Sequence, residues 1–250
     1  MRIGGITDFS TVDWYGCPSM VVFFAGCNFK CPYCQNSALI PTDSGEEVEL
    51  GLLRDRMQKA LTPVETIEAV VFTGGEPTLQ GEELIDAAQI VKDFGLMLML
   101  DTNGSITESF NRIIDTGLID RVALDVKAPL NEEDYRKVSG SKKKGLVESI
   151  REAIRICKDR DIPLEARTTV APTISDDPDS IRMISEEISG KSTVYYLQQY
   201  DNHGEILDSE LKEMAPPTRD RMIELADIAC STGLRDVYIK TRRNGLERVC

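Results

Sequence analysis

The sequence is poor in histidine, in basic residues and in long apolar runs. Its single histidine, His203, belongs to no paired Cys/His spacing of the kind that holds structural zinc. Asp and Glu number 42 against 29 Lys and Arg, for a net charge of -13. Because a phosphate backbone is bound by clustered cations, this excess disfavours a nucleic-acid partner. No apolar run approaches the roughly 18 residues of a membrane helix, so we expect no membrane partner.

The scattered cysteines predict no covalent framework. The first ten residues, "MRIGGITDFS", lack the charged-then-apolar layout of a secretion signal, so we expect a cytoplasmic protein with mostly reduced thiols. Cys157 and Cys230 fall on apolar faces of predicted helices, where a free cysteine acts as a small hydrophobe. The terminal Cys250 is expected to be mobile. The one basic cluster, "SKKKG" at 141–145, is interpreted as a solvated loop.

Strand-like and helix-like segments alternate along nearly the whole chain. Apolar runs predict six strands buried on both faces, as in parallel sheets covered by helices, and they span 20–26, 68–75, 96–104, 121–127, 164–172 and 193–200. Helical spacing of apolar residues predicts helices at 48–61, 81–95, 107–117, 146–160, 177–189 and 218–233. A final strand at 236–240 is expected to pair with the N-terminal segment.

The repeated strand-helix units predict an α/β fold. A partial (β/α)6 barrel is favoured, and an open doubly wound sheet is the alternative. We expect a single domain over 1–250, with a core of about 18–215, a lead-in at 1–17, and a C-terminal helix and strand at 216–250. Both arrangements place the chemistry at the carboxyl ends of the strands, where the chain carries its unusual residues.

Three cysteines cluster after the first predicted strand. Cys27, Cys31 and Cys34 follow a Cys-x3-Cys-x2-Cys spacing in a segment of polar character. A structural zinc site closes with four ligands, whereas a cubane cluster bound by three thiolates keeps one iron without a protein ligand. Thiolates suit both zinc and iron-sulfur centres, so the spacing favours an iron-sulfur cluster and leaves a zinc loop as the alternative.

Two further motifs follow predicted strands. In "TGGEPTLQ", Gly74 and Gly75 indicate either a tight turn or a close approach of the backbone to a ligand, and Glu76 could accept hydrogen bonds from an ammonium group. In "DTNG", residues 101–104 indicate either an Asx turn or oxygen ligands for a ribose, a carboxylate or a hard cation.

Charged residues end two later strands. Asp125 and Lys127 alternate in "LDVKAP" and therefore face the same way, as a surface salt bridge or as a carboxylate-binding group. Arg167 lies inside a predicted strand, where an unpaired guanidinium is costly, so it requires an anionic partner.

The cysteine segment, with Tyr33 before its third cysteine, resembles that of the radical S-adenosylmethionine (SAM) superfamily. The resemblance implies a [4Fe-4S] cluster held by Cys27, Cys31 and Cys34, with SAM chelating the fourth iron. One-electron cleavage of SAM would yield a 5′-deoxyadenosyl radical that abstracts hydrogen, so no protein acid or base is expected. By the same resemblance the methionyl amino group of SAM is contacted by Gly74, Gly75 and Glu76.

The order of the segments resembles one branch of that superfamily, the activating enzymes of glycyl radical enzymes. The match covers about residues 5–215 and rests on "FSTVDWYG", "DTNG", "LDVK", "RTTVAPTISDD" and "LQQYDNHG". The family pattern implies a monovalent cation beside SAM, surrounded by Asp101, Thr102 and Asp125. It places Lys127 and Arg167 near the SAM carboxylate, and we assign Tyr33 and Asn103 to the same cofactor site.

The resemblance also implies partner proteins. The substrate would be a glycyl radical enzyme, such as an anaerobic ribonucleotide reductase or a pyruvate formate-lyase, and the electron donor a flavodoxin or ferredoxin. Gln35 stands where many relatives carry histidine after the third cysteine. The alternatives are a radical SAM enzyme acting on a different substrate and a metal-stabilised binding protein without turnover.

Overall fold

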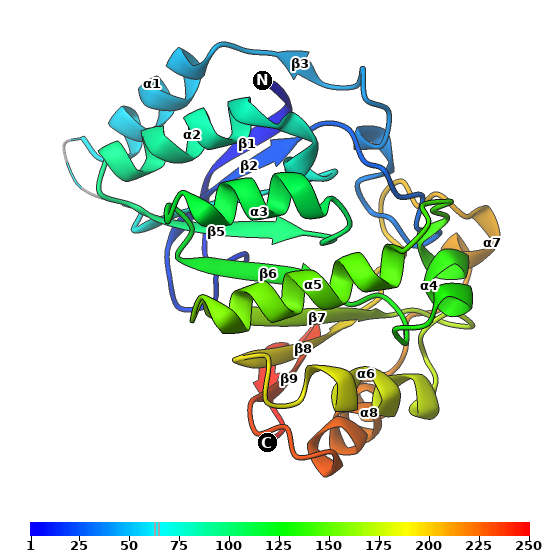
Figure 1. Ribbon diagram of the computed structural model, residues 1–250. Coiled ribbons are helices and arrows are strands. Elements are labelled where there is room, and N and C mark those ends of the chain that lie inside the picture. The colour runs from blue at the N-terminus through cyan, green and yellow to red at the C-terminus, as the bar shows by residue number, and fades with distance from the viewer. Residues whose placement is uncertain (63, 65) are drawn as a thin grey trace. The chain divides into compact units, whose positions relative to one another are not determined.

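The computed structural model describes residues 1–62, 64 and 66–250 (Figure 1). These residues form two compact units. The first unit comprises 1–28, 38–102 and 106–122, and the second comprises 29–37, 103–105 and 123–250. The single-domain organisation over 1–250 stays a prediction.

Parallel strands form the centre of the first unit. β2 (Ser19–Phe24) runs parallel to β4 (Ala69–Gly74), and β4 runs parallel to β5 (Met97–Thr102). Apart from Phe23 and Met97, the apolar side chains on these strands are buried, as their apolar sequences predict. β1 (Arg2–Ser10), which the sequence reading missed, pairs antiparallel with β2 and with the short β3 (Glu46–Glu47).

Amphipathic helices connect the strands of the first unit. They are α1 (Leu50–Ala60), α2 (Glu82–Asp93) and α3 (Thr107–Asp115), with a 3-10 turn, η2 (Pro77–Gln80), after β4. A second 3-10 turn, η1 (Ser37–Leu39), follows the cysteine segment. α2 buries a stripe of apolar residues and is followed by Gly95 with φ +74°, the left-handed residue that ends many helices.

The second unit continues the alternation. β7 (Leu164–Val170), β8 (Val194–Gln199) and β9 (Val237–Thr241) are parallel neighbours, and β10 (Gly245–Arg248) returns antiparallel to β9. The predicted pairing of the last strand with the N-terminal segment is therefore wrong. The helix between β8 and β9, α8 (Arg219–Ser231), acts as a crossover that brings β9 beside β8. The strand-helix repeat is thereby extended by one unit.

The remaining strand, β6 (Arg121–Asp125), enters the second unit at Ala123. Just beyond its end, the backbone N–H of Val126 donates to the carbonyl of Arg167 at 2.8 Å, beside β7. The predicted α/β class with parallel strands is thus confirmed by parallel pairs in both units.

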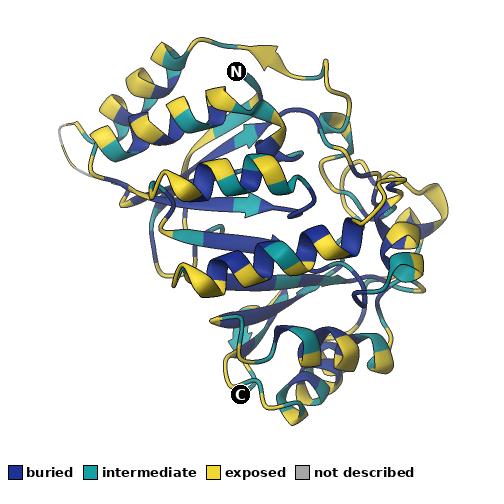
Figure 2. Ribbon diagram, in the orientation of Figure 1, coloured by how far each residue is buried: buried dark blue, intermediate teal, exposed yellow. Residues whose placement is uncertain are grey.

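Five helices belong to the second unit, namely α4 (Glu132–Ser139), α5 (Leu146–Asp159), α6 (Pro178–Ile188), α7 (Ser209–Lys212) and α8 (Arg219–Ser231). The sequence reading missed α4, although Asn131 caps its N-terminus through the N–H of Asp134 and Gly140 ends it with φ +64°. Figure 2 shows buried and exposed residues alternating along α5, as its amphipathic sequence requires. Cys157 is buried on α5 as predicted, and burial raises the pKa of its thiol to about 12.

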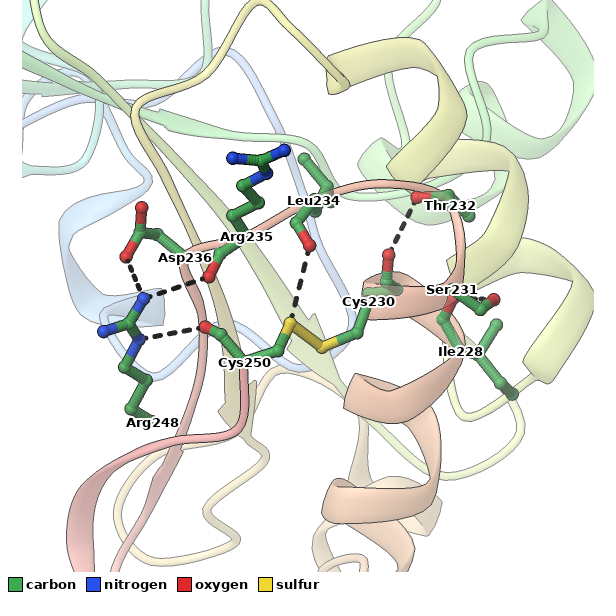
Figure 3. The surroundings of a disulfide bond; sticks show 10 residues. Ile228, Cys230, Ser231, Thr232, Leu234, Arg235, Asp236, Arg248 and Cys250 are labelled. Atoms are coloured by element: carbon green, nitrogen blue, oxygen red, sulfur yellow. Dashed lines mark hydrogen bonds and ion pairs between the residues drawn. A yellow bond between two sulfur atoms is a disulfide. The ribbon is translucent and has the colours of Figure 1, made fainter.

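A disulfide joins Cys230 to Cys250 (Figure 3). The predictions that Cys230 is a free hydrophobe and that Cys250 is mobile are therefore wrong. The hairpin of β9 and β10 returns the terminal residue to Val237, which exchanges backbone hydrogen bonds with Cys250. This places the terminal Cα 6.2 Å from that of Cys230, in the last turn of α8. The other five cysteines form no disulfide.

No described helix is both long enough and apolar enough to cross a membrane.

Candidate functional site

Cys27 lies in the first unit, directly after a glycine turn at the end of β2. Its backbone N–H donates to the carbonyl of Ile40 at 3.0 Å, and the N–H of Gly26 donates to Leu39 at 2.8 Å. Gly26 has φ +88°, which favours glycine, and Cys27 is partly exposed. Cys31 lies four positions after Cys27 in the chain, so covalent geometry alone keeps their Cα atoms within about 14 Å.

Cys31 and Cys34 lie in the second unit on a single turn, where the N–H of Cys34 donates to the carbonyl of Cys31 at 3.0 Å. Cys31 is buried and Cys34 is partly exposed. Burial raises the pKa of the Cys31 thiol to about 11, although the ammonium of Lys127 acts to lower it. The same ammonium acts on Cys34, where burial also raises the pKa. The two thiols therefore share one cationic neighbour, which suits thiolate ligands.

Tyr33 lies between these cysteines and carries an unsatisfied buried group. Its side chain is 5% exposed, and its hydroxyl has no hydrogen-bond partner among the described residues. The ring centroid is 6.0 Å from Nζ of Lys127, at the limit of a cation-π contact. Burial raises the pKa of Tyr33, so the hydroxyl is a neutral donor. A buried hydroxyl without a partner fits a site completed by a bound group.

The two glycines of "TGGEPTLQ" are required by the fold itself. A Cβ on Gly74 would lie 2.3 Å from the carbonyl oxygen of Phe24, and Gly74 has φ +114°. A Cβ on Gly75 would lie 2.1 Å from the carbonyl oxygen of Gly26. The tight-turn interpretation is therefore confirmed, because the end of β4 approaches the end of β2 too closely for any side chain.

Glu76 is fully buried and couples the ends of β4 and β5. Its Oε1 accepts hydrogen bonds from the backbone N–H of Thr78 at 3.1 Å and from the hydroxyl of Thr102 at 2.7 Å. The hydroxyl of Thr78 donates to the same oxygen at 2.5 Å. This network fixes the carboxylate, a requirement for a group that is to orient a ligand.

The "DTNG" segment forms the predicted Asx turn, in which Oδ1 of Asn103 accepts from the N–H of Ser105 at 2.9 Å. Gly104 has φ +67°, and a Cβ there would lie 2.6 Å from a methyl group of Leu124. Asp101, at the end of β5, is half-buried in the first unit. The Asx turn does not exclude a ligand site at this motif, because an ordered turn also presents oxygen atoms.

Asp125 and Lys127 form a half-buried ion pair rather than a surface salt bridge. The Nζ of Lys127 lies 2.7 Å from Oδ2 of Asp125, and the two side chains are 12% and 43% exposed. Although burial lowers the pKa of Lys127, Asp125 and Cys31 raise it well above its usual range. The hydroxyl of buried Tyr135 donates to the carbonyl of Asp125 at 3.0 Å and holds this strand end in place.

Arg167 has its anionic partner on its own strand. Its guanidinium lies 2.6 Å from Oε1 of Glu165, and the two side chains are only 12% and 4% exposed. The sequence reading missed Glu165, although a spacing of two residues puts both on one face of β7.

The cysteine segment is held by a late loop that the sequence reading did not connect to it. The Nε2 of Gln35 donates to the carbonyl of Asp201 at 3.3 Å, and the hydroxyl of Ser37 donates to the carbonyl of Glu205 at 2.7 Å. His203 lies on this loop and contacts Oδ1 of Asp201 at 2.6 Å. The lone histidine thus belongs to the loop that supports the cysteine segment.

The described residues contain no group of three His, Cys, Asp or Glu side chains placed to hold a single metal ion. The donor set nevertheless fits a polynuclear iron-sulfur cluster, because three thiols that form no disulfide occupy one short segment and two of them share a cation.

The radical SAM superfamily model matches residues 21–184 of this chain. A Methanocaldococcus jannaschii protein, provisionally named a glycyl-radical enzyme activating enzyme, is 32% identical over 91% of each chain. The pyruvate formate-lyase 1-activating enzyme of Escherichia coli K12 is 30% identical over 74% of each chain.

A solved structure supports the fold. The crystal structure of a radical SAM methyltransferase from Sphaerobacter thermophilus superposes with a TM-score of 0.74 over 92% of this chain and 68% of that one, at 13% identity. At that identity the likeness concerns the fold alone. It agrees with the partial barrel that the sequence predicts. The chain belongs to the radical SAM superfamily, and its relatives include a protein provisionally named a glycyl-radical enzyme activating enzyme and one named a pyruvate formate-lyase 1-activating enzyme.

Proposed function

We propose that this protein is a cytoplasmic activating enzyme that abstracts a hydrogen atom from a glycine of a partner glycyl radical enzyme, of the anaerobic ribonucleotide reductase or pyruvate formate-lyase type. The observation that carries the proposal is the donor set of Cys27, Cys31 and Cys34, in which the ammonium of Lys127 acts electrostatically on the thiols of Cys31 and Cys34. The names of the two relatives described above support the choice of substrate.

When bound, a [4Fe-4S] cluster and SAM supply one-electron cleavage to a carbon radical, and the protein supplies binding, orientation and exclusion of water. The three cysteines hold the cluster. Lys127 is a cation close to Cys31, and it favours the thiolate form that binds metal. The neutral hydroxyl of Tyr33 donates a hydrogen bond to the bound group.

The strand ends provide the cofactor contacts. The turn at Gly74 and Gly75 presents backbone without side chains, and the carboxylate of Glu76, fixed by Thr102, would accept from the amino group of SAM. Arg167 and Lys127 would bind the carboxylate of SAM, and Asn103 would complete the site.

A monovalent cation beside SAM would take oxygen ligands from Asp101, Thr102 and Asp125. Because Oδ2 of Asp125 is paired with Lys127, the cation would use Oδ1 of that carboxylate.

Anaerobic reconstitution with iron and sulfide tests the proposal. We expect about four irons per chain, formation of 5′-deoxyadenosine from SAM with a low-potential reductant, and a glycyl doublet in the electron paramagnetic resonance spectrum of the partner. Cys31→Ala should abolish all three, whereas the matched variant Cys157→Ala should retain them. Binding of a single zinc without SAM cleavage would overturn the proposal. Formation of 5′-deoxyadenosine without a doublet on either type of partner would overturn the assigned substrate.

A further inference from the structure

One short stretch of the second unit is basic, although the chain as a whole is acidic. Residues 135–147 contain five basic residues and no acidic one, in a protein where acidic residues outnumber basic ones by 13. We use the name basic patch for the exposed cations Lys30, Arg136, Lys137, Lys142 and Lys144.

Lys30 adjoins this stretch through the backbone. Its N–H donates to the carbonyl of Ser139 at 2.8 Å, at the end of α4. A Cβ built on Gly140 would lie 3.2 Å from the Cβ of Lys30, so the two chain segments are in direct contact. The guanidinium of Arg136 reaches the carbonyl of Lys143 at 3.5 Å and folds the stretch back on itself. The cations are therefore gathered on one surface of the second unit.

Lys143 anchors the loop that carries its neighbours. Its ammonium donates to the carbonyl of Ser105 and, at 3.0 Å, to the hydroxyl of Ser149. Residues 142–145 are all exposed, which confirms the solvated loop predicted for 141–145. The hydrogen bonds of Lys143 hold this loop in place, with Lys142 and Lys144 exposed on either side of it.

The lysines of the basic patch can attract an acidic partner. Within the described residues, Lys30, Lys137, Lys142 and Lys144 form no ion pair with an acidic side chain, whereas Arg136 is paired with Glu132 at 2.8 Å. Four unpaired cations on a chain of charge -13 attract an acidic surface locally, while the rest of the chain repels it.

The position of the patch identifies the partner. Lys30 immediately precedes the buried Cys31, so the patch borders the segment that would hold the cluster. Electron transfer between proteins requires a short separation between the two redox centres. Encounters of this kind use small, polar, transient interfaces guided by charge.

We propose that the basic patch is the docking surface for an acidic one-electron donor protein of the flavodoxin or ferredoxin class. In the step that it serves, the reduced donor loses one electron, the oxidised cluster gains it, and no bond forms or breaks. This inference rests on the proposed function, since it requires a cluster bound at the cysteine segment.

The test compares two charge-reversal variants of the reconstituted holoprotein. Lys142→Glu/Lys144→Glu alters the patch, and Lys158→Glu/Arg235→Glu makes the same charge change at exposed positions outside it. Lys158 lies twelve residues beyond the start of α5, about 18 Å along the helix from the patch. The probes are a purified bacterial flavodoxin and a plant-type ferredoxin, each of net negative charge. Dissociation constants are measured by calorimetry at about 50 mM and about 300 mM salt, across which screening changes strongly.

We expect the wild type to bind at least one donor, and the patch variant to bind it about tenfold more weakly at low salt, with little remaining salt dependence. The control variant should stay within about twofold of the wild type. Cluster reduction by dithionite, followed by visible absorbance, should be equal in all three proteins, while reduction by the donor should slow only in the patch variant. Equal binding by the patch and control variants would overturn the proposal, as would failure of the wild type to bind either donor. Failure of dithionite to reduce the cluster would instead count against the proposed function.

Discussion

Variants of Glu165 and Arg167 can distinguish a structural role of Arg167 from a role in cofactor binding. Both side chains lie on one face of β7, and their charged groups are 2.6 Å apart with little exposure to solvent. The proposed function gives the guanidinium a second task, contact with the carboxylate of SAM. We consider Arg167→Met, Glu165→Gln and the double variant.

The magnitude follows from burial. Removing one partner of a buried ion pair leaves an uncompensated charge and costs about 3–5 kcal/mol, whereas replacing both partners with groups of similar volume is often close to neutral. Glu165, only 4% exposed, would lose this ion-pair partner in Arg167→Met. We therefore expect Arg167→Met to lower the free energy of unfolding by about 3 kcal/mol, and the double variant to recover to within about 1 kcal/mol of the wild type.

Two assays distinguish the roles. Urea unfolding followed by circular dichroism gives the stability of the four proteins, and equilibrium dialysis of the reconstituted holoproteins gives their affinity for SAM. If the guanidinium binds SAM, the double variant should be stable yet weak in SAM binding. Wild-type affinity in the stable double variant would refute the cofactor role. A double variant as unstable as Arg167→Met would refute the assignment of Glu165 as the partner that matters.

Three further predictions concern the second unit. Reduction of the disulfide between Cys230 and Cys250 should lower the free energy of unfolding by about 3 kcal/mol, because the disulfide closes a loop of 20 residues. Urea unfolding with and without a phosphine reductant measures this change, and the stability of Cys230→Ser should not respond to the reductant. Asp177→Ala should cost about 1 kcal/mol at neutral pH, since Asp177 caps α6 through the N–H of Ser180. Hydrogen bonding from Ser180 lowers the pKa of Asp177, so this stabilisation should be present above the ordinary value of 3.8 and be lost as the pH falls through the lower folded value; an unchanged difference at pH 2 would contradict it. Cys157, with its pKa raised to about 12 by burial, should resist iodoacetamide at pH 8 in the native protein and react in urea, which mass spectrometry detects.

Much of the fold was predictable because the signals are local. Apolar runs and helical spacing located β2, β4, β5, β7 and β8 to within about two residues. The missed α4 also carried local signals at its two ends, namely the capping Asn131 and the terminal Gly140. The first strand was missed because its alternation is weak, with two glycines in nine residues.

The residues of the candidate site were predictable from the sequence, but many of the contacts between them were not. The alternation of Asp125 with Lys127 gave their common orientation, and the structure adds that their pair is half-buried. The partner of Arg167 lay two residues away, but the prediction of an external anion concealed it. The support that the loop at Asp201 gives to Gln35 joins residues 166 positions apart, and no local pattern reports it.

The sequence by itself determined the donor set and the alternation of strands and helices. Three thiols at Cys-x3-Cys-x2-Cys spacing are a property of eight consecutive residues, and periodicity is a property of each segment. Only the tertiary structure decided which distant groups meet, because packing brings them together. Three features depend on contacts between segments distant in sequence: the closure of the chain terminus onto Cys230, the approach of β2 that forbids a side chain at Gly74 and Gly75, and the hydrogen bond from Lys143 to Ser105.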